Sequence, residues 1–185
     1  KLSELEIEEL EEIQRILKEL TEFLRAFIPE FEEYKQYLTH TDVIAAKAKY
    51  GRKIKGCLPM MVDHQELELV DAYHPLLWVA NNERGEKTYP QTIRLAPDNR
   101  IIVISGPNAG GKSITLKTIG LLQLMIQTGM LIPVHEKSRI CIFEHVLTDI
   151  GDNQRSDNHL STYSYRLKNM RGFLRIANDK TLFLI

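Results

Sequence analysis

The chain has few of the residues on which small secreted and metal-binding proteins depend. Its 185 residues include two cysteines, one tryptophan and six scattered histidines. Cys57 and Cys141 form neither a close pair nor a metal-ligand spacing, which argues against a disulfide framework and a structural zinc site. No apolar run approaches the roughly 18 residues of a membrane-spanning helix, and no signal peptide is visible. We therefore expect a globular protein of the reducing cytoplasm that has no membrane partner.

A large excess of charge of one sign is also missing, but the charge is unevenly distributed. The formal net charge is −1, with 26% charged and 43% hydrophobic residues. Residues 1–33 hold most of the acidic excess, and the remainder is mildly basic. We do not expect the acidic segment itself to bind nucleic acid. The remainder is only mildly basic, so its charge does not indicate a strong phosphate-binding surface.

The first segment reads as two helices. Apolar residues recur every three or four positions and mark one face of a helix: Leu10, Ile13, Leu17, Leu20, Leu24 and Phe27. Pro29 interrupts this pattern, and a second helix is predicted from there to Tyr50, with Gly51 as its C-terminal stop. We interpret the two as a packed, solvated helical pair and place a domain boundary near Gly51. The predicted domains are thus residues 1–51 and 52–185.

Residues 52–185 alternate between strand and helix patterns, which indicates an α/β fold with a mainly parallel sheet. A helix is expected over 114–128, closed by Gly129, and another from Ser161 or Thr162 onward. Residues 81–85 read as a loop and 97–99 as a turn. Strands are predicted at 58–62, 66–72, 92–95, 101–104, within 138–148, and at 181–185.

Residues 106–113 carry the clearest chemical signal. Their sequence, Gly-Pro-Asn-Ala-Gly-Gly-Lys-Ser, fits the phosphate-loop (P-loop, Walker A) template G-x-x-x-x-G-K-[ST] at every fixed position. Glycines let backbone N–H groups approach an anion, and the following helix adds positive potential at its N-terminus. Lys112 would reach the β- and γ-phosphates of ATP, and Ser113 would ligate Mg²⁺. The predicted nucleotide-binding residues are Gly106, Pro107, Asn108, Ala109, Gly110, Gly111, Lys112 and Ser113.

Three other elements have both a structural and a functional interpretation. Asp152 and Gln154 could lie near Mg²⁺ and the attacking water, although Asp and Asn are ordinary loop residues in the surrounding stretch. Ser161 or Thr162 reads as a plain helix N-cap, and alternatively as a phosphate contact. His74 and Tyr89 belong to aromatic-bearing elements that could stack on adenine, although core packing is the commoner role for such side chains. His135, Glu136 and His145 are assigned no chemistry.

The carboxylates that such a site needs are missing from the sequence. P-loop ATPases hold Mg²⁺ through an acidic residue at the end of a second buried strand. Residues 181–185 have the pattern of that strand, and the sequence ends at Ile185 before any acid. The catalytic acidic residues are therefore expected beyond Ile185. We expect this polypeptide alone to bind nucleotide weakly and to hydrolyse it negligibly.

The motifs together resemble the MutS family. Residues 104–113 are similar to its P-loop, with Gly-Pro-Asn before the paired glycines, and residues 73–77 look like its His-Pro element. Residues 149–154, followed by 160–164, are similar to the MutS-two branch in particular. The resemblance covers essentially the whole chain, with the N-terminal helices as the end of the core and lever. Residues 155–158 depart from the more acidic stretch that the branch has there.

The resemblance implies an ABC-type ATPase whose two subunits sandwich two ATP molecules. Ser161 and Thr162 would then face the γ-phosphate bound by the partner, and Asp152 and Gln154 would couple the nucleotide to the rest of the protein. Asn108 would contact phosphate or water, and His74 and Tyr89 would lie near adenine. The acidic Mg²⁺ motif, the later switch histidine and the C-terminal Smr nuclease domain of this branch are absent from the sequence.

The function implied for the intact homodimer is ATP-driven action on branched or damaged DNA that restrains recombination, a DNA-repair role without the mismatch-reading domain. Members of the branch are also implicated in splitting collided ribosomes, so the bacterial location would be the nucleoid or the ribosome. Four alternatives stay open: an ABC-type ATPase that acts only in ribosome rescue, a P-loop kinase or transporter ATPase, a helical dimerisation module with vestigial nucleotide binding, and a coiled-coil chromosome ATPase.

Overall fold

The chain forms two compact units, residues 1–46 and 47–185. A computed structural model describes residues 2–107, 110–150 and 159–185, except for the side chains of 159–163 and 165. The two units are taken separately below.

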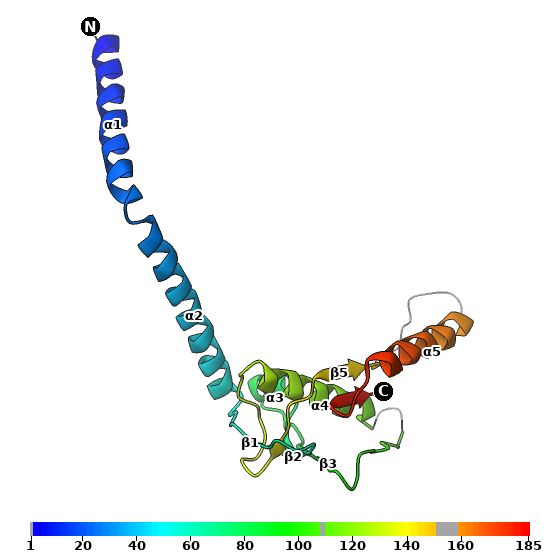
Figure 1. Ribbon diagram of the computed structural model, residues 1–185. Coiled ribbons are helices and arrows are strands. Elements are labelled where there is room, and N and C mark those ends of the chain that lie inside the picture. The colour runs from blue at the N-terminus through cyan, green and yellow to red at the C-terminus, as the bar shows by residue number, and fades with distance from the viewer. Residues whose placement is uncertain (1, 108–109, 151–158) are drawn as a thin grey trace. The chain divides into compact units, whose positions relative to one another are not determined.

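The first unit consists of α1 (Leu2–Arg25) and most of α2 (Ile28–Lys53), as the periodicity predicts (Figure 1). Pro29 lies in the first turn of α2, where its missing N–H leaves no hydrogen bond unmade. On α1, Arg15 forms ion pairs with Glu12 and Glu19, each at 2.6 Å. The predicted packing of the pair is wrong, because no residue of α1 is buried and Leu10 is 59% exposed. Helical periodicity identifies an apolar face and leaves its partner unspecified.

Gly51 does not end the second helix. The helix runs through it to Lys53, and Gly51 is buried. A Cβ at this position would lie 3.0 Å from Cδ1 of Leu131, so the glycine permits close packing rather than a left-handed stop. The turn is made instead after the helix, at Lys55, whose φ is 50°.

The second unit contains two separate sheets, so the fold is mixed α/β. The four-stranded sheet has the order β1-β4-β2-β3, and the other pairs β5 with β6. In the larger sheet β1 and β4 are parallel, whereas β2 runs antiparallel to both of its neighbours, with Leu67 opposite Leu95 and Leu69 opposite Ile93. The prediction of a mainly parallel sheet is therefore wrong there and correct for β5–β6. The strands are β1 (Met60–Met61), β2 (Leu67–Ala72), β3 (Gln91–Leu95), β4 (Arg139–Ile140), β5 (His145–Thr148) and β6 (Thr181–Leu184).

The last strand is one residue shorter than the predicted 181–185. It ends at Leu184, and Ile185 follows it without regular secondary structure and with 56% of its surface exposed. The pairing explains this end, because Thr148 of β5 lies opposite Leu184 and no strand residue of β5 lies opposite Ile185. The apolar composition of Ile185 therefore does not place it in the core.

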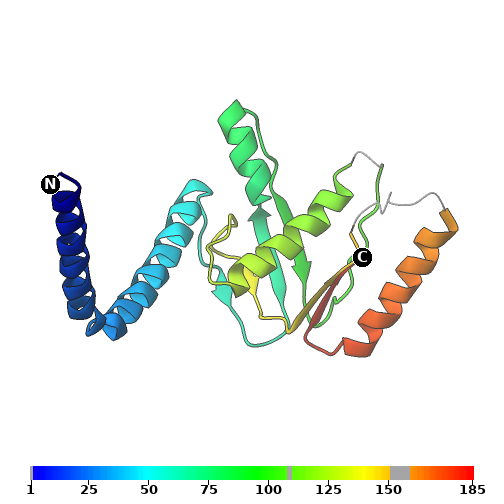
Figure 2. The ribbon, with the colours of Figure 1, turned by 90° about the horizontal axis from the view of Figure 1, so that it is seen from above.

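Three helices complete this unit: α3 (Pro75–Arg84), α4 (Lys112–Gln127) and α5 (His159–Ile176). Helix α4 crosses the face of the larger sheet (Figures 1 and 2) and supplies buried Ile119, Leu122, Met125 and Ile126 to the core. Gly129 closes it with a φ of 74°. The loop expected at 81–85 is wrong, because 81–84 continue α3 and only Gly85 leaves it, in the left-handed conformation.

The strand predicted at 101–104 is also absent. These residues have no regular secondary structure, and Val103 is 85% exposed. A strand requires a hydrogen-bonded neighbour, and no backbone hydrogen bond joins 101–104 to another described residue. The segment instead borders an apolar cavity of about 370 Å³, which is also lined by residues of β2, β3, α4 and β6.

Among the described residues, no helix is both long enough and apolar enough to cross a membrane.

Candidate functional site

The 106–113 loop joins the irregular segment to α4 through two glycines with positive φ. Gly106 has a φ of 148° and Gly111 a φ of 82°, conformations that a residue with a Cβ rarely adopts. Between them, the Gly110 N–H donates to the carbonyl of Pro107 at 2.9 Å. A Cβ at Gly110 would lie 3.0 Å from the same oxygen. The loop backbone is therefore built for glycine at these positions.

Helix α4 begins at Lys112 with its N-terminus open. Gly111 is the N-cap, and in the described part of the chain no side-chain hydrogen bond caps this end of the helix. These N–H groups and the helix dipole favour an anion at this end. The Lys112 ammonium folds back over the loop and donates to the carbonyl oxygens of Gly106 and Pro107, both at 2.6 Å. A cation and an open helix N-terminus thus occupy the same loop.

Ser113 lies in the first turn of α4 with an exposed side chain, and no described residue hydrogen-bonds its hydroxyl. The neighbouring hydroxyl of Thr115 donates to the carbonyl of Gly111 at 3.0 Å, so it is committed to the helix. Ser113 therefore carries the accessible hydroxyl in the part of the loop that the structure describes. An oxygen ligand beside phosphates suits Mg²⁺, so the donor set fits a magnesium-bound nucleotide.

Several predicted site residues fall outside what the structure describes: Asn108, Ala109, Asp152 and Gln154. Ser161 and Thr162 lie in the first turn of α5, whose start is His159. The interpretation of either as the N-cap is consequently wrong, because the cap must precede His159. The directions of their side chains are not described.

The acidic residues expected beyond Ile185 stay a prediction. The strand that should lead to them is present as β6, in parallel pairing with β5. Leu182 and Leu184 of this strand are buried, as the predicted second buried strand requires. Strand β6 therefore has the burial expected of an element that delivers a carboxylate.

His74 is the N-cap of α3. Its Nδ1 accepts a hydrogen bond from the Leu77 N–H at 3.4 Å, and Pro75 follows in the first turn of the helix. Burial lowers the pKa of His74, and the positive charge of Lys117 on α4 lowers that pKa further. The His-Pro element therefore adjoins the helix that carries the loop. Tyr73 packs edge-on against Trp78, with ring centroids 4.6 Å apart, as expected for a packed aromatic.

Tyr89 is placed differently from His74. Its side chain is 72% exposed, and the Lys87 ammonium lies 5.0 Å from its ring centre. Its described contacts thus include no residue of the 106–113 loop.

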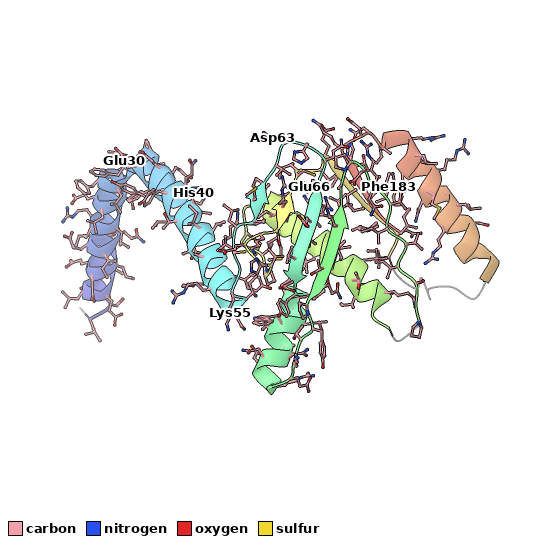
Figure 3. All side chains as sticks on the ribbon, turned by 90° about the horizontal axis from the view of Figure 1, so that it is seen from below. Glu30, His40, Lys55, Asp63, Glu66 and Phe183 are labelled. Atoms are coloured by element: carbon pink, nitrogen blue, oxygen red, sulfur yellow. The ribbon has the colours of Figure 1, made fainter. Side chains whose placement is uncertain are left out.

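Two charge clusters escaped the sequence reasoning. Glu66, which is labelled in Figure 3, directly precedes β2 and is 4% exposed. Its Oε2 lies 2.8 Å from His64 Nε2 and 3.5 Å from Arg139 Nη2. Asp149, directly after β5, pairs with Arg166 of α5 at 3.6 Å. Glutamate and aspartate are common in loops, so only the tertiary contacts separate these two from their neighbours. His135 and His145 lie at the surface and at the start of β5, as expected.

Comparison with known proteins assigns these features to one family. Residues 102–185 match the model of MutS domain V, a span that includes the 106–113 loop, α4, α5 and both strands of the smaller sheet. The chain is 43% identical over 180 residues to the Endonuclease MutS2 of Listeria monocytogenes, covering 97% of this chain. The chain belongs to the MutS family. Its membership of the MutS2 branch follows from further Endonuclease MutS2 relatives, 39% identical over 184 residues in Pediococcus pentosaceus and 40% over 169 in Lactobacillus acidophilus.

The resemblance inferred from the motifs is therefore confirmed. The MutS2 match extends over 100% of this chain in the Pediococcus relative and 91% in the Lactobacillus relative. The match covers only 22% of the Listeria relative, 23% of the Pediococcus relative and 21% of the Lactobacillus relative. The chain thus spans between a fifth and a quarter of the length of these endonuclease-named proteins.

Proposed function

We propose that the intact protein is an ATPase of the ABC type that binds ATP and Mg²⁺ through residues 106–113, in a domain that begins near residue 52. The observation that carries the proposal is the position of Lys112. Its ammonium is held at 2.6 Å from two carbonyls of the loop that precedes an uncapped helix N-terminus. A cation, the amides at the open start of α4 and an accessible hydroxyl at Ser113 are the groups that recognise a magnesium polyphosphate.

Each group would have one role when nucleotide binds. Lys112 would leave the loop carbonyls and neutralise β- and γ-phosphate oxygens, while the first-turn amides of α4 hydrogen-bond the phosphates. Ser113 would hold Mg²⁺, which supplies charge neutralisation during phosphoryl transfer. Asp152 and Gln154 would then relate the nucleotide to the rest of the protein, with Asn108 in contact with phosphate or water. Ser161 and Thr162 would meet the nucleotide of a second subunit.

The proposed substrate is branched or damaged DNA, which the ATP-closed homodimer would hold in order to restrain recombination. Support comes from membership of the MutS family and from relatives that carry the name Endonuclease MutS2. ATP would favour the closed dimer because the partner's first turn of α5 gains a γ-phosphate contact only in that form. Action on collided ribosomes is the alternative that the test below must separate.

The nucleotide half of the proposal is tested by titrating a fluorescent ATP analogue with Mg²⁺ against the protein and its Lys112→Ala variant. We expect the dissociation constant to rise at least tenfold, since a charge-assisted hydrogen bond to phosphate contributes about 1.5–3 kcal/mol. Lys49→Ala is the matched control, because this exposed lysine lies on α2. Equal affinities for Lys112→Ala and Lys49→Ala would contradict the proposed site.

The substrate half needs the full-length protein with a non-hydrolysable ATP analogue. Branched DNA and collided ribosomes are titrated in parallel at one near-physiological salt concentration, because phosphate-driven binding falls steeply with salt. We expect nucleotide-dependent binding to branched DNA that Lys112→Ala abolishes. Nucleotide-dependent preference for ribosomes would replace DNA by the ribosome as the substrate and leave the ATPase proposal standing.

A further inference from the structure

We propose that the ion pair between Asp149 and Arg166 is a positioning contact that ties the middle of α5 to the end of β5 and thereby sets the position of the first turn of the helix, which carries Ser161 and Thr162. This inference rests on the proposed function, since it concerns how ATP closes the dimer. Asp149 and Arg166 act here as positioning residues that need not touch the nucleotide.

Asp149 is held firmly on the side of the sheet. Its backbone N–H donates to the carbonyl of Leu184 at 2.9 Å, which ties the end of β5 to the end of β6. Its side chain is only 10% exposed. Oδ2 has no hydrogen-bond partner in the described part of the chain, and Arg166 Nε lies 3.6 Å from it. Because a carboxylate removed from water requires a counter-charge, Arg166 is the described group that compensates this oxygen.

Among the described contacts, helix α5 also packs on the smaller sheet near its C-terminal end. There Phe173 packs against Phe183 of β6, with ring centroids 6.4 Å apart (Figure 3 labels Phe183). Nearer the N-terminus the apolar side chain of Leu167 is half exposed, so it adds little to the attachment. The ion pair is thus a contact that ties the middle of α5 to the sheet.

The separation of the charged atoms leaves the pair adjustable. A charge-assisted N–H···O contact between guanidinium and carboxylate closes to about 2.7–2.9 Å, shorter than the 3.6 Å found here. Arg166 is half exposed, and the Asp149 contact is not its whole set of interactions, so the pair with Asp149 is one of the contacts that place this side chain. Thr162 precedes Arg166 by little more than one helical turn, so a movement of Arg166 carries the first turn of α5 with it. A tightened pair would present that turn to a partner's nucleotide in one fixed position.

The test uses the full-length protein labelled for inter-subunit energy transfer, with closure titrated by a non-hydrolysable ATP analogue. The variants are Asp149→Asn, Arg166→Gln and the two combined, with Arg166→Lys as the charge-conserving variant. Arg171→Gln is the control, an exposed arginine on the same helix. ATP affinity of the isolated 106–113 site is measured separately, at protein concentrations below dimer closure.

We expect Asp149→Asn and Arg166→Gln each to raise the analogue concentration for half-closure by about tenfold, with unchanged ATP affinity below closure. The double variant should be no worse than either single, because the two residues act through one contact. Arg166→Lys should recover part of the loss, and Arg171→Gln should match the wild type.

Additive effects in the double variant, or closure losses that Arg171→Gln shares, would overturn the inference. If circular dichroism shows that Asp149→Asn is unfolded, the comparison of Arg166→Gln with Arg166→Lys tests the inference instead. Lys112→Ala distinguishes a failure of the proposed function from a failure of this inference. If Lys112→Ala closes normally with the analogue, the proposed function is wrong. If Lys112→Ala loses closure while the ion-pair variants close like the wild type, only this inference is wrong.

Discussion

Gly120 of α4 lies directly against Leu184 of β6, so closely that a Cβ at position 120 would lie 2.8 Å from Leu184 Cδ1. Leu184 is 3% exposed and belongs to the same core cluster as Ile119 and Leu122. The helix that carries the 106–113 loop therefore packs on the smaller sheet through a glycine. This close approach joins α4 to β6 and so brings the two sheets into one core.

Gly120→Ala should lower the free energy of unfolding by about 1 kcal/mol. Alanine gains up to about 1 kcal/mol in helix propensity, but overpacking a buried side chain costs about 1–3 kcal/mol. Gly172→Ala on α5 is the matched control, since a Cβ there meets nothing within 4 Å. It should raise stability by up to about 1 kcal/mol. Urea unfolding of the three proteins measures both, and an equal gain in both variants would refute the packing argument.

Gln123 should be needed for the attachment of α4 to the chain between β4 and β5. Its buried Nε2 donates to the Cys141 carbonyl at 2.9 Å and to Gln127 Oε1 at 2.7 Å, and the latter oxygen accepts from the Phe143 N–H. Gln123→Leu removes both bonds, so we expect a loss of about 1–2 kcal/mol in the urea-derived free energy of unfolding.

Gln14→Leu on the exposed surface of α1 controls for the general effect of the substitution. A Gln123→Leu protein as stable as the Gln14→Leu protein would show that the network around Gln123 contributes nothing.

The features that the sequence predicts well are those set by local pattern. The glycines and Lys112 of the loop follow a fixed spacing, and the amphipathic periodicity of 114–128 yields α4 within two residues at its start. β2 and β3 likewise appear where alternation and flanking turns predict them. Motif and periodicity are local, and these elements need little further information.

What the sequence does not predict depends on distant partners. Residues 101–104 have an ideal strand composition but no hydrogen-bonded neighbour in the described chain, and Gly51 is buried against Leu131 rather than ending a helix. The Asp149–Arg166 pair brings together residues on either side of the 151–158 stretch, which lies outside the described residues. Tertiary contacts, and not local preference, decide each of these cases.

Stability should fall with decreasing pH through the titration of His74. Burial, and then Lys117, hold the pKa of this imidazole below its ordinary value of 6.5. The unfolded chain therefore takes up the proton first, so the contribution of His74 is full above about pH 6.5 and is lost as the pH falls through the lowered pKa. Protonation also removes Nδ1 as the acceptor for the Leu77 N–H.

Melting temperatures from pH 8 to pH 5 measure this effect. His74→Asn keeps a capping acceptor without a titratable group, so its melting temperature should vary less with pH than that of the wild type. His40→Asn, at an exposed position on α2, should follow the wild-type curve. Parallel curves for all three proteins would remove His74 as the cause.

Backbone amides of residues 101–104 should exchange with deuterium much faster than those of residues 67–69. The first group has no described backbone partner, whereas the second lies in a strand paired on both sides. Exchange requires opening of the hydrogen bond, so unpaired amides lack protection. Mass spectrometry of peptides spanning the two segments provides the comparison, and equal protection would mean that 101–104 is paired in solution.

The carbonyl oxygens of Gly106 and Pro107 compete with any incoming anion for the ammonium group of Lys112. Any incoming anion must displace two short contacts to the ammonium before it can use that charge. A small monovalent anion offers too few oxygens to replace both carbonyls and also engage the helix amides, whereas a chain of linked phosphates offers enough for all of them at once. If residues 106–113 bind nucleotide as proposed, this resting contact would favour ligands with several phosphate oxygens, whatever base or sugar they carry.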